Sequence, residues 1–218
     1  SRFELREMHP NLHLGTASDR FAGWIGQIYP DSYTSAIESR PSRTKGQTVV
    51  EQIIPVESVG YYFERFDVLE IDFTFYRPLR DARGVAQNTL GLLQQYAEHA
   101  PEDALFLLKA PQMYFARQLR RTNEGVISFV NNPDFLNAEA CRQQFIEPAV
   151  ETLQDRLLGI IFEQGYQRAH DAPSPEQNIA ELDGFFGSLP AGVQHHIELR
   201  TESLLVRSYF DWLEARGY

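Results

Sequence analysis

The sequence predicts an α/β protein built on a parallel sheet, of the (β/α)8 TIM-barrel type. Five short apolar runs alternate with amphipathic helical patterns along the 218 residues, and this alternation is typical of parallel strands joined by crossover helices. The hydrophobic share of 43% is enough for a substantial core. An open, doubly wound sheet is the competing fold, but the first run lacks the glycine-rich turn expected after its first strand.

The expected strands are runs of aliphatic, aromatic and β-branched residues, and the expected helices repeat their apolar residues every three or four positions. The strands are 11–17, 66–78, 104–110, 157–164 and 193–200, and the helices are 84–100, 137–157, 174–190 and 203–218. Asn137 and Ser174 are the expected N-caps, and Pro148 is expected to kink or restart its helix.

Two segments interrupt this alternation. Residues 31–55 form a long polar insertion, which we interpret as a mobile surface loop, with a lid as the alternative. Residues 111–136 follow the third strand and would lie on the catalytic face of a barrel. Three arginines in the second segment could bind an anion there, although a solvated helix face explains them more simply; they are Arg117, Arg120 and Arg121.

Composition excludes several classes of protein. The net charge of −10 argues against non-specific nucleic-acid binding, which depends on Lys and Arg. Cys141 is the single cysteine, so no intrachain disulfide can form, and a cytoplasmic location is the natural expectation. No apolar run approaches the roughly 20 residues of a membrane span. The expected partner is a small molecule, and the sequence indicates neither a cofactor nor an oligomeric state.

The second expected strand carries charge where a buried strand would not. Side chains alternate between the two faces of a strand. One face of this strand therefore presents Leu69, Ile71, Phe73 and Phe75, and the other presents Glu70, Asp72 and Thr74. We interpret the polar face as the lining of a site.

Polar residues also stand near the carboxyl ends of the other four strands. They are Thr16, Lys109 in phase with Leu105 and Leu107, Gln164 in phase with Ile160 and Phe162, and the in-phase set His196, Glu198 and Arg200. The carboxyl ends of barrel strands meet at one mouth, where active sites lie. The alternative is structural neutralisation, with Lys109 pairing Glu70 and Arg200 pairing Glu198.

Several stretches resemble the YecE-like family, a domain of unknown function (number 72) with a TIM-barrel-type fold. "GTASDRFAGWIGQIYP" is similar to its opening signature and "LEIDFTFYRP" to its second-strand signature. "FLLKAP", "LLGIIFEQ" and "LPAGVQHHIELR" are similar to later motifs, in the same order. At these matching positions the resemblance implies that Thr16, Trp24 and Tyr76 bind substrate.

The chain also departs from that family pattern. Asp72 stands where the family usually has Asn, and Ala116, Thr201 and Leu204 replace residues of the site face. The family continues for three further strands, whereas this sequence ends at Tyr218. Five strands cannot close a barrel of eight. We expect the C-terminal strands to be absent from this chain, and the alternative is an open, partly barrel-like sheet with an unpaired edge.

These residues predict an enzyme that acts on a small polar or anionic substrate. Glu70 or Glu198 would be the general acid or base, with Lys109 as a third catalytic residue. Substrate contacts are expected from Thr16, Trp24, Asp72, Tyr76, Gln164 and Arg200. One alternative is a metal-dependent phosphoester hydrolase or sugar isomerase that uses Glu70, Asp72, His196 and Glu198, although one inward histidine predicts no metal site. The other alternative is a non-catalytic binding or scaffold protein.

Overall fold

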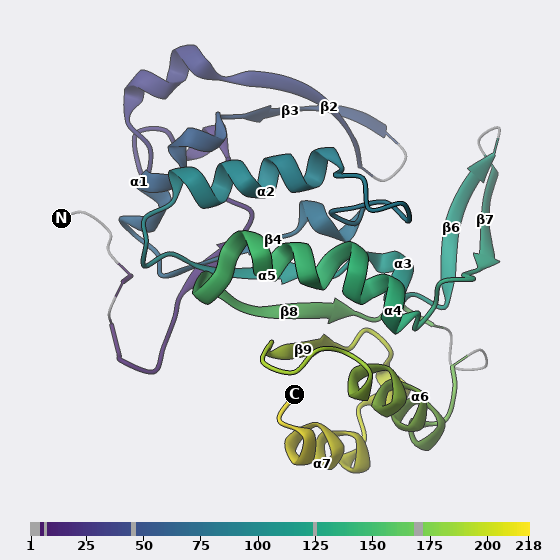
Figure 1. Ribbon diagram of the computed structural model, residues 1–218. Coiled ribbons are helices and arrows are strands. Elements are labelled where there is room, and N and C mark those ends of the chain that lie inside the picture. The colour runs from purple at the N-terminus through teal and green to yellow at the C-terminus, as the bar shows by residue number, and fades with distance from the viewer. Residues whose placement is uncertain (1–4, 7, 45–46, 124–125, 168–171) are drawn as a thin grey trace.

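The chain folds around a five-stranded sheet in which every neighbouring pair of strands is parallel (Figure 1). The computed structural model describes residues 5–6, 8–44, 47–123, 126–167 and 172–218. Along the sheet the strands are β1 (Gly15–Ala17), β4 (Val68–Ile71), β5 (Leu105–Lys109), β8 (Leu157–Glu163) and β9 (His195–Glu198). The parallel α/β prediction is confirmed. In the described residues β1 and β9 are the two edges of the sheet, and an eight-stranded closed barrel stays a prediction.

Helices form within each of the four predicted ranges, and two further short helices, at Val59–Phe63 and Gln112–Phe115, were not predicted. The helices are α1 (Val59–Phe63), α2 (Asn88–His99), α3 (Gln112–Phe115), α4 (Ala138–Cys141), α5 (Glu147–Leu153), α6 (Pro175–Gly187) and α7 (Arg207–Arg216). Short 3-10 turns cover Ala22–Trp24, Asp31–Ala36, Val56–Ser58, Phe73–Phe75, Gln154–Arg156 and Glu202–Leu204. No helix in these described ranges is long and apolar enough to cross a membrane.

The predicted helix signals have the expected structural effects. The side chains of Asn137 and Ser174 each accept a hydrogen bond from a backbone N–H three residues later. Pro148 restarts its helix, because the π-helical turn Arg142–Ile146 separates α4 from α5, and the proline lies in the first turn of α5. A proline tolerates this position because the first N–H groups of a helix have no intrahelical partner.

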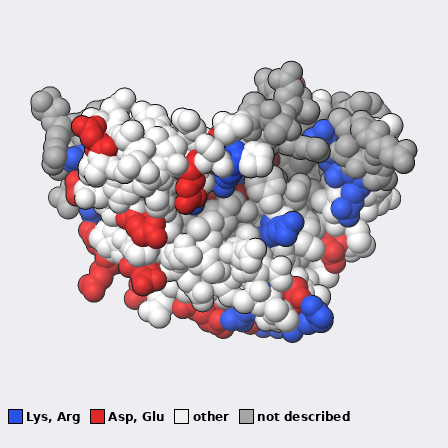
Figure 2. All heavy atoms as spheres, turned by 90° about the horizontal axis from the view of Figure 1, so that it is seen from above, with Lys and Arg blue, Asp and Glu red and all other residues white. Residues whose placement is uncertain are grey.

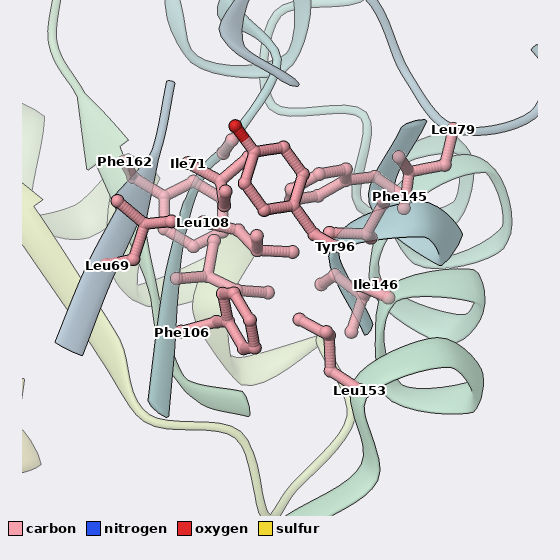
Figure 3. Close-up of a cluster of buried hydrophobic side chains, with 14 of the residues drawn as sticks. Leu69, Ile71, Leu79, Tyr96, Phe106, Leu108, Phe145, Ile146, Leu153 and Phe162 are labelled. Atoms are coloured by element: carbon pink, nitrogen blue, oxygen red, sulfur yellow. The ribbon is translucent and has the colours of Figure 1, made fainter. Parts of the chain in front are cut away.

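The core lies between the sheet and the helices that cover one of its faces (Figure 3). The strands contribute Leu69, Ile71, Phe106, Leu108 and Phe162, and the helical segments contribute Tyr96, Phe145, Ile146 and Leu153. All of these side chains are buried. Burial of each large apolar side chain stabilises the fold by about 1.5–3 kcal/mol. This face of the sheet is therefore fixed by packing, and the opposite face is left for the polar residues.

The structure shortens the second predicted strand. β4 ends at Ile71, and the 3-10 turn Phe73–Phe75 follows Asp72. The predicted alternation holds inside β4, where Leu69 and Ile71 are buried and Glu70 is half-buried. It does not extend to Thr74, whose buried hydroxyl donates to the carbonyl of Lys109 at 2.6 Å. Thr74 thus ties two strand ends together and does not line the polar face.

Both interrupting segments contain antiparallel hairpins. In the 31–55 insertion, β2 (Glu38–Thr44) pairs with β3 (Gln47–Ile53), so a simple surface loop was the wrong prediction. In 111–136, β6 (Gln118–Asn123) pairs with β7 (Val126–Asn131), which replaces the expected helix face. No described residue of these four strands belongs to the core or packs against it, so no buried face imposes an alternation of apolar residues, and polar strands of this kind resemble loops in sequence.

Candidate functional site

Lys109, at the end of β5, holds three carboxylates from three other strands. Its Nζ atom lies 2.5 Å from Glu163 Oε2, 3.2 Å from Glu198 Oε2 and 4.0 Å from Glu70 Oε1. The lysine side chain is only 15% exposed. These contacts exist because the carboxyl ends of the parallel strands β4, β5, β8 and β9 meet at one edge of the sheet.

A second cation joins the same carboxylates. Arg200 Nε lies 3.1 Å from Glu163 Oε1, and Arg200 Nη2 lies 2.6 Å from Glu198 Oε1. We call the five residues Glu70, Lys109, Glu163, Glu198 and Arg200 the glutamate cluster. It contains three acidic and two basic groups, so its formal charge is negative when all of the carboxyls are ionised.

Strand register explains why these side chains share a face. Residues paired across a sheet point to the same side, and Glu163 is paired with Glu198 in the β8–β9 ladder. In the β4–β5 ladder Glu70 is paired with Leu107, which stands two residues before Lys109. The glutamate cluster therefore lies on the face of the sheet opposite the helix-packed core.

Glu70 and Glu198 have opposite pKa shifts. Burial raises the pKa of Glu70, helped by the negative charges of Asp72, Glu198 and Glu163 and opposed by Lys109. Burial also acts to raise the pKa of Glu198, but hydrogen bonds from Lys109 and Arg200 outweigh it and lower that pKa. Glu70 is therefore the carboxyl that more readily holds a proton, and Glu198 is the one that stays ionised.

Glu163 is a member of the cluster that the sequence analysis missed. Its side chain accepts the shortest hydrogen bond of Lys109, at 2.5 Å, and also binds Arg200. The sequence carries no signal that separates Glu163 from Gln164, because Ile160, Ile161 and Phe162 before them are all apolar. In the structure Glu163 is in phase with Gly159, where a Cβ atom would lie 2.6 Å from Nε2 of His196.

The structure corrects the placement of Gln164, which lies on the helix side of the sheet. Its Nε2 donates to Asn178 Oδ1 at 2.9 Å and lies 3.3 Å from the hydroxyl of Tyr209. The side chain is buried in this polar network. The reason is that Gln164 is in phase with Ile160 and Phe162, and both of those residues face the core.

Thr16 also faces the helix side, since it is paired with buried Leu69. Its backbone N–H donates to the hydroxyl oxygen of Tyr62 at 2.8 Å, and its own hydroxyl donates to the carbonyl of Ser18. Trp24 packs against Tyr29, with ring centroids 6.5 Å apart. The described contacts of Thr16 and Trp24 therefore do not bring them to the glutamate cluster.

Asp72 and Tyr76 lie near the cluster in different ways. The hydroxyl of Ser18 donates to Asp72 Oδ1 at 2.8 Å, and the charge of Asp72 contributes to the raised pKa of Glu70. Tyr76 is 73% exposed and its ring contacts Phe75, whose own ring centroid is 5.6 Å from the ammonium of Lys109. Both predicted binding residues thus border the cluster without joining its ion pairs.

The two adjacent histidines face opposite sides of β9. His195 is buried on the helix side, where its ring stacks on Phe186 at 5.3 Å. His196 is half-buried on the cluster side, and burial lowers its pKa. In the described ranges no group of three or more His, Cys, Asp or Glu residues is arranged to hold a metal ion. The absence of a tightly bound transition metal stays a prediction.

Comparison with known proteins identifies the family. Residues 51–218 match the family model described as "Protein of unknown function DUF72". The chain belongs to the DUF72 family. This confirms the resemblance to the YecE-like proteins, domain of unknown function 72, that the sequence motifs indicated. The family description assigns no activity.

A solved structure of a DUF72 protein shows the same type of fold. A DUF72 family protein from Thermotoga maritima is 18% identical, with a TM-score of 0.54 over 94% of this chain and 62% of that chain. One from Enterococcus faecalis is 13% identical, with a TM-score of 0.49 over 76% of this chain and 52% of that chain. The chain thus spans about half to two thirds of the length of these relatives. No curated protein matches it.

Proposed function

We propose that this DUF72 chain is an enzyme that performs general acid–base chemistry on a small polar substrate at the glutamate cluster. The opposite pKa shifts of Glu70 and Glu198 carry the proposal. Both carboxylates approach the same Lys109 Nζ, so their two nearest oxygens are at most about 7 Å apart. Neighbouring carboxyls with pKa values pushed apart are a recurring arrangement for an acid and a base.

In this proposal Glu70 donates the proton and Glu198 acts as the base or nucleophile. Lys109 and Arg200 keep Glu198 ionised through their ion pairs, which lower its pKa. The hydrolysis of a glycosidic bond is one reaction that such a pair supports, and the separation of the two carboxyls would decide its stereochemistry.

The charge balance favours a neutral polar substrate over an anionic one. Lys109 already contacts three carboxylates, and Arg200 contacts two of them. An anion would have to displace one of these ion pairs to reach either cation. The ammonium of Lys109 also lies where a metal ion would have to sit among the three glutamates, which disfavours a metal-dependent hydrolase.

The test uses a panel of p-nitrophenyl glycosides and p-nitrophenyl esters as probes, with release of nitrophenol as the readout. General acid–base groups contribute about 10²–10⁴-fold to a rate, so Glu70→Gln and Glu198→Gln should each lose about that much kcat/KM. Glu214→Gln, on the exposed side of α7, is the matched control and should keep the wild-type rate. If no probe is hydrolysed, or if both site variants retain full activity, the proposal is wrong.

A further inference from the structure

The hairpin β6–β7 stands apart from the body of the molecule (Figure 1). It is a two-stranded sheet, and in the described residues neither strand is hydrogen-bonded to a third strand. An isolated two-stranded hairpin is marginally stable in water, and both of its free edges carry backbone groups that can pair with another strand. We call this hairpin the arm. It therefore needs support from the residues at its base or from a partner.

The root of the hairpin is firmly anchored. Asn132 is buried, and its Nδ2 donates to the carbonyls of Met113 at 2.5 Å and Ala116 at 2.7 Å. Arg117, just before β6, is ion-paired with Glu181, and its guanidinium lies 4.5 Å from the ring centroid of Phe135. The arm is thus held outward by a fixed base that packs against the body.

The outer part of the arm combines exposed apolar side chains with unpaired positive charge. Val126 is 68% exposed and Phe129 is 64% exposed, and Val130 is also exposed. Arg120 and Arg121 are exposed and form no ion pair with any described residue. Among the described residues of the hairpin both charged side chains are basic, in a chain of net charge −10; Glu124 lies outside the described residues.

We propose that the β6–β7 arm is a docking surface for an acidic, extended peptide segment of another protein. The segment would add as a third strand to a free edge of the hairpin, where main-chain hydrogen bonds supply affinity and alternate side chains supply specificity.

Arg120 is paired with Phe129 in the ladder, so these two share one face of the hairpin, and Arg121 and Val130 share the other. A strand added beside β6 also alternates its side chains between the two faces. Acidic residues on each of its faces would pair with Arg120 and Arg121, and apolar residues on each face would pack toward Phe129 and Val130. Charge complementarity selects an acidic partner, because Arg120 and Arg121, which form no ion pair with any described residue, disfavour a basic one.

Two other occupants would carry negative charge to the arm. A second copy of this acidic chain is one, and a single-stranded nucleic acid stacking on Phe129 is the other. A nucleic-acid groove usually needs a continuous basic stripe. On the face shown in Figure 2, several Lys and Arg side chains lie together at the right and the others stand apart among acidic and neutral residues, so no continuous basic stripe crosses this face. We therefore favour the peptide and treat the others as outcomes of the test.

The test measures fluorescence anisotropy with a labelled eight-residue peptide of two Glu-Glu-Val-Val repeats, which as a strand presents both residue types on both faces, and with its Lys-Lys-Val-Val counterpart. The acidic peptide should bind the whole chain, and the basic peptide should bind at least about tenfold more weakly. Each exposed ion pair contributes less than about 1 kcal/mol, so the double variant Arg120→Ser/Arg121→Ser should bind about tenfold more weakly. Phe129→Ser should weaken binding to a similar extent, and Arg83→Ser, an exposed arginine outside the arm, should not.

Several results would overturn the proposal. They are equal binding of the two peptides, binding of the acidic peptide that the arm variants leave unchanged, and no detectable binding. Sedimentation that shows wild type self-associating and the Phe129→Ser variant monomeric would assign the arm to a second copy instead. Binding of a poly-dT oligonucleotide that depends on Phe129 would assign it to nucleic acid. Circular dichroism of each variant checks that the fold is retained.

Discussion

Lys109 Nζ donates to Glu163 Oε2 at 2.5 Å, which joins β5 to β8 across 54 positions of the chain. Both side chains are mostly buried, at 15% and 12% exposure. Neither residue can lose its partner without leaving a charge in a poorly solvated place. This pair organises the glutamate cluster, because Glu70, Glu198 and Arg200 also contact one or the other of its members.

We expect Lys109→Met to lower the free energy of unfolding by about 2–4 kcal/mol, since breaking a buried pair is costly and some solvent reaches this one. Glu163→Gln should also destabilise the fold. The loss of unfolding free energy in the double variant Lys109→Met/Glu163→Gln should be at least about 1 kcal/mol smaller than the sum of the two single losses. Urea denaturation at pH 7 measures the cycle. Arg207→Met, which breaks the exposed pair with Asp211, is the control and should cost under about 1 kcal/mol. Additive costs at Lys109 and Glu163 would contradict the coupling.

Asp19 should make the fold less stable as pH rises. Burial raises its pKa from 3.8 to about 6, although the hydroxyl of Tyr96 donates to it at 2.6 Å. Because the folded-state pKa is the higher one, the unfolded chain releases this proton first, and stability falls between about pH 4 and pH 6. Asp19→Asn cannot ionise. Relative to wild type it should gain about 2–3 kcal/mol of stability between pH 4 and pH 7.5, since each pKa unit corresponds to about 1.4 kcal/mol.

Denaturant titrations of Asp19→Asn and wild type at several pH values provide the measurement. The difference between the two free energies of unfolding should change with pH, and this change reports the ionisation of Asp19. Any packing cost of the amide is present at every pH and does not contribute to the change. A difference that is independent of pH would show that Asp19 titrates normally in the folded protein.

His195 should make the fold more stable as pH rises, which is opposite to the effect of Asp19, over a similar pH range. Burial lowers its pKa from 6.5 to about 4. The unfolded chain therefore takes up this proton first as pH falls, and stability is lost between about pH 6.5 and pH 4. His195→Phe should be more stable relative to wild type at pH 4.5 than at pH 7.5. The phenyl ring suits the site because His195 already packs against Phe162 and Phe186.

Thermal unfolding of His195→Phe and wild type at both pH values measures this effect. Asp19 and His195 oppose one another, so the two variants should diverge in opposite directions from the wild-type pH profile. Parallel profiles for His195→Phe and wild type would show that His195 has the same pKa in the folded and unfolded states.

Ser18 adopts a left-handed backbone with φ of 63°, a conformation that favours glycine. Its hydroxyl donates to Asp72 at the border of the glutamate cluster. Ser18→Ala removes this hydrogen bond and keeps the strain, whereas Ser18→Gly removes both. We expect the glycine variant to be more stable than the alanine variant by about 1 kcal/mol in urea denaturation. Equal stability would show that the backbone at this position is unstrained.

The sequence by itself determined the parallel α/β arrangement and much of the cluster. The order of strands and helices depends on local periodicity, which every segment carries in its own residues. Glu70, Lys109, Glu198 and Arg200 were found because polar residues near the carboxyl ends of parallel strands must meet at one edge. Family membership followed from motifs in a fixed order. These features need no knowledge of which side of a strand meets the helices.

Only the tertiary structure decided which phase of β8 faces the cluster. Ile160, Ile161 and Phe162 are all apolar, so the strand offers no contrast between its two faces, and Glu163 and Gln164 are both polar. Packing of Ile160 and Phe162 against the helices turned Gln164 inward to the core and Glu163 toward Lys109. The two hairpins were hidden for a related reason. Their strands are paired with each other in two-stranded sheets, and none of their described residues belongs to the core, so packing imposes no pattern of apolar residues there.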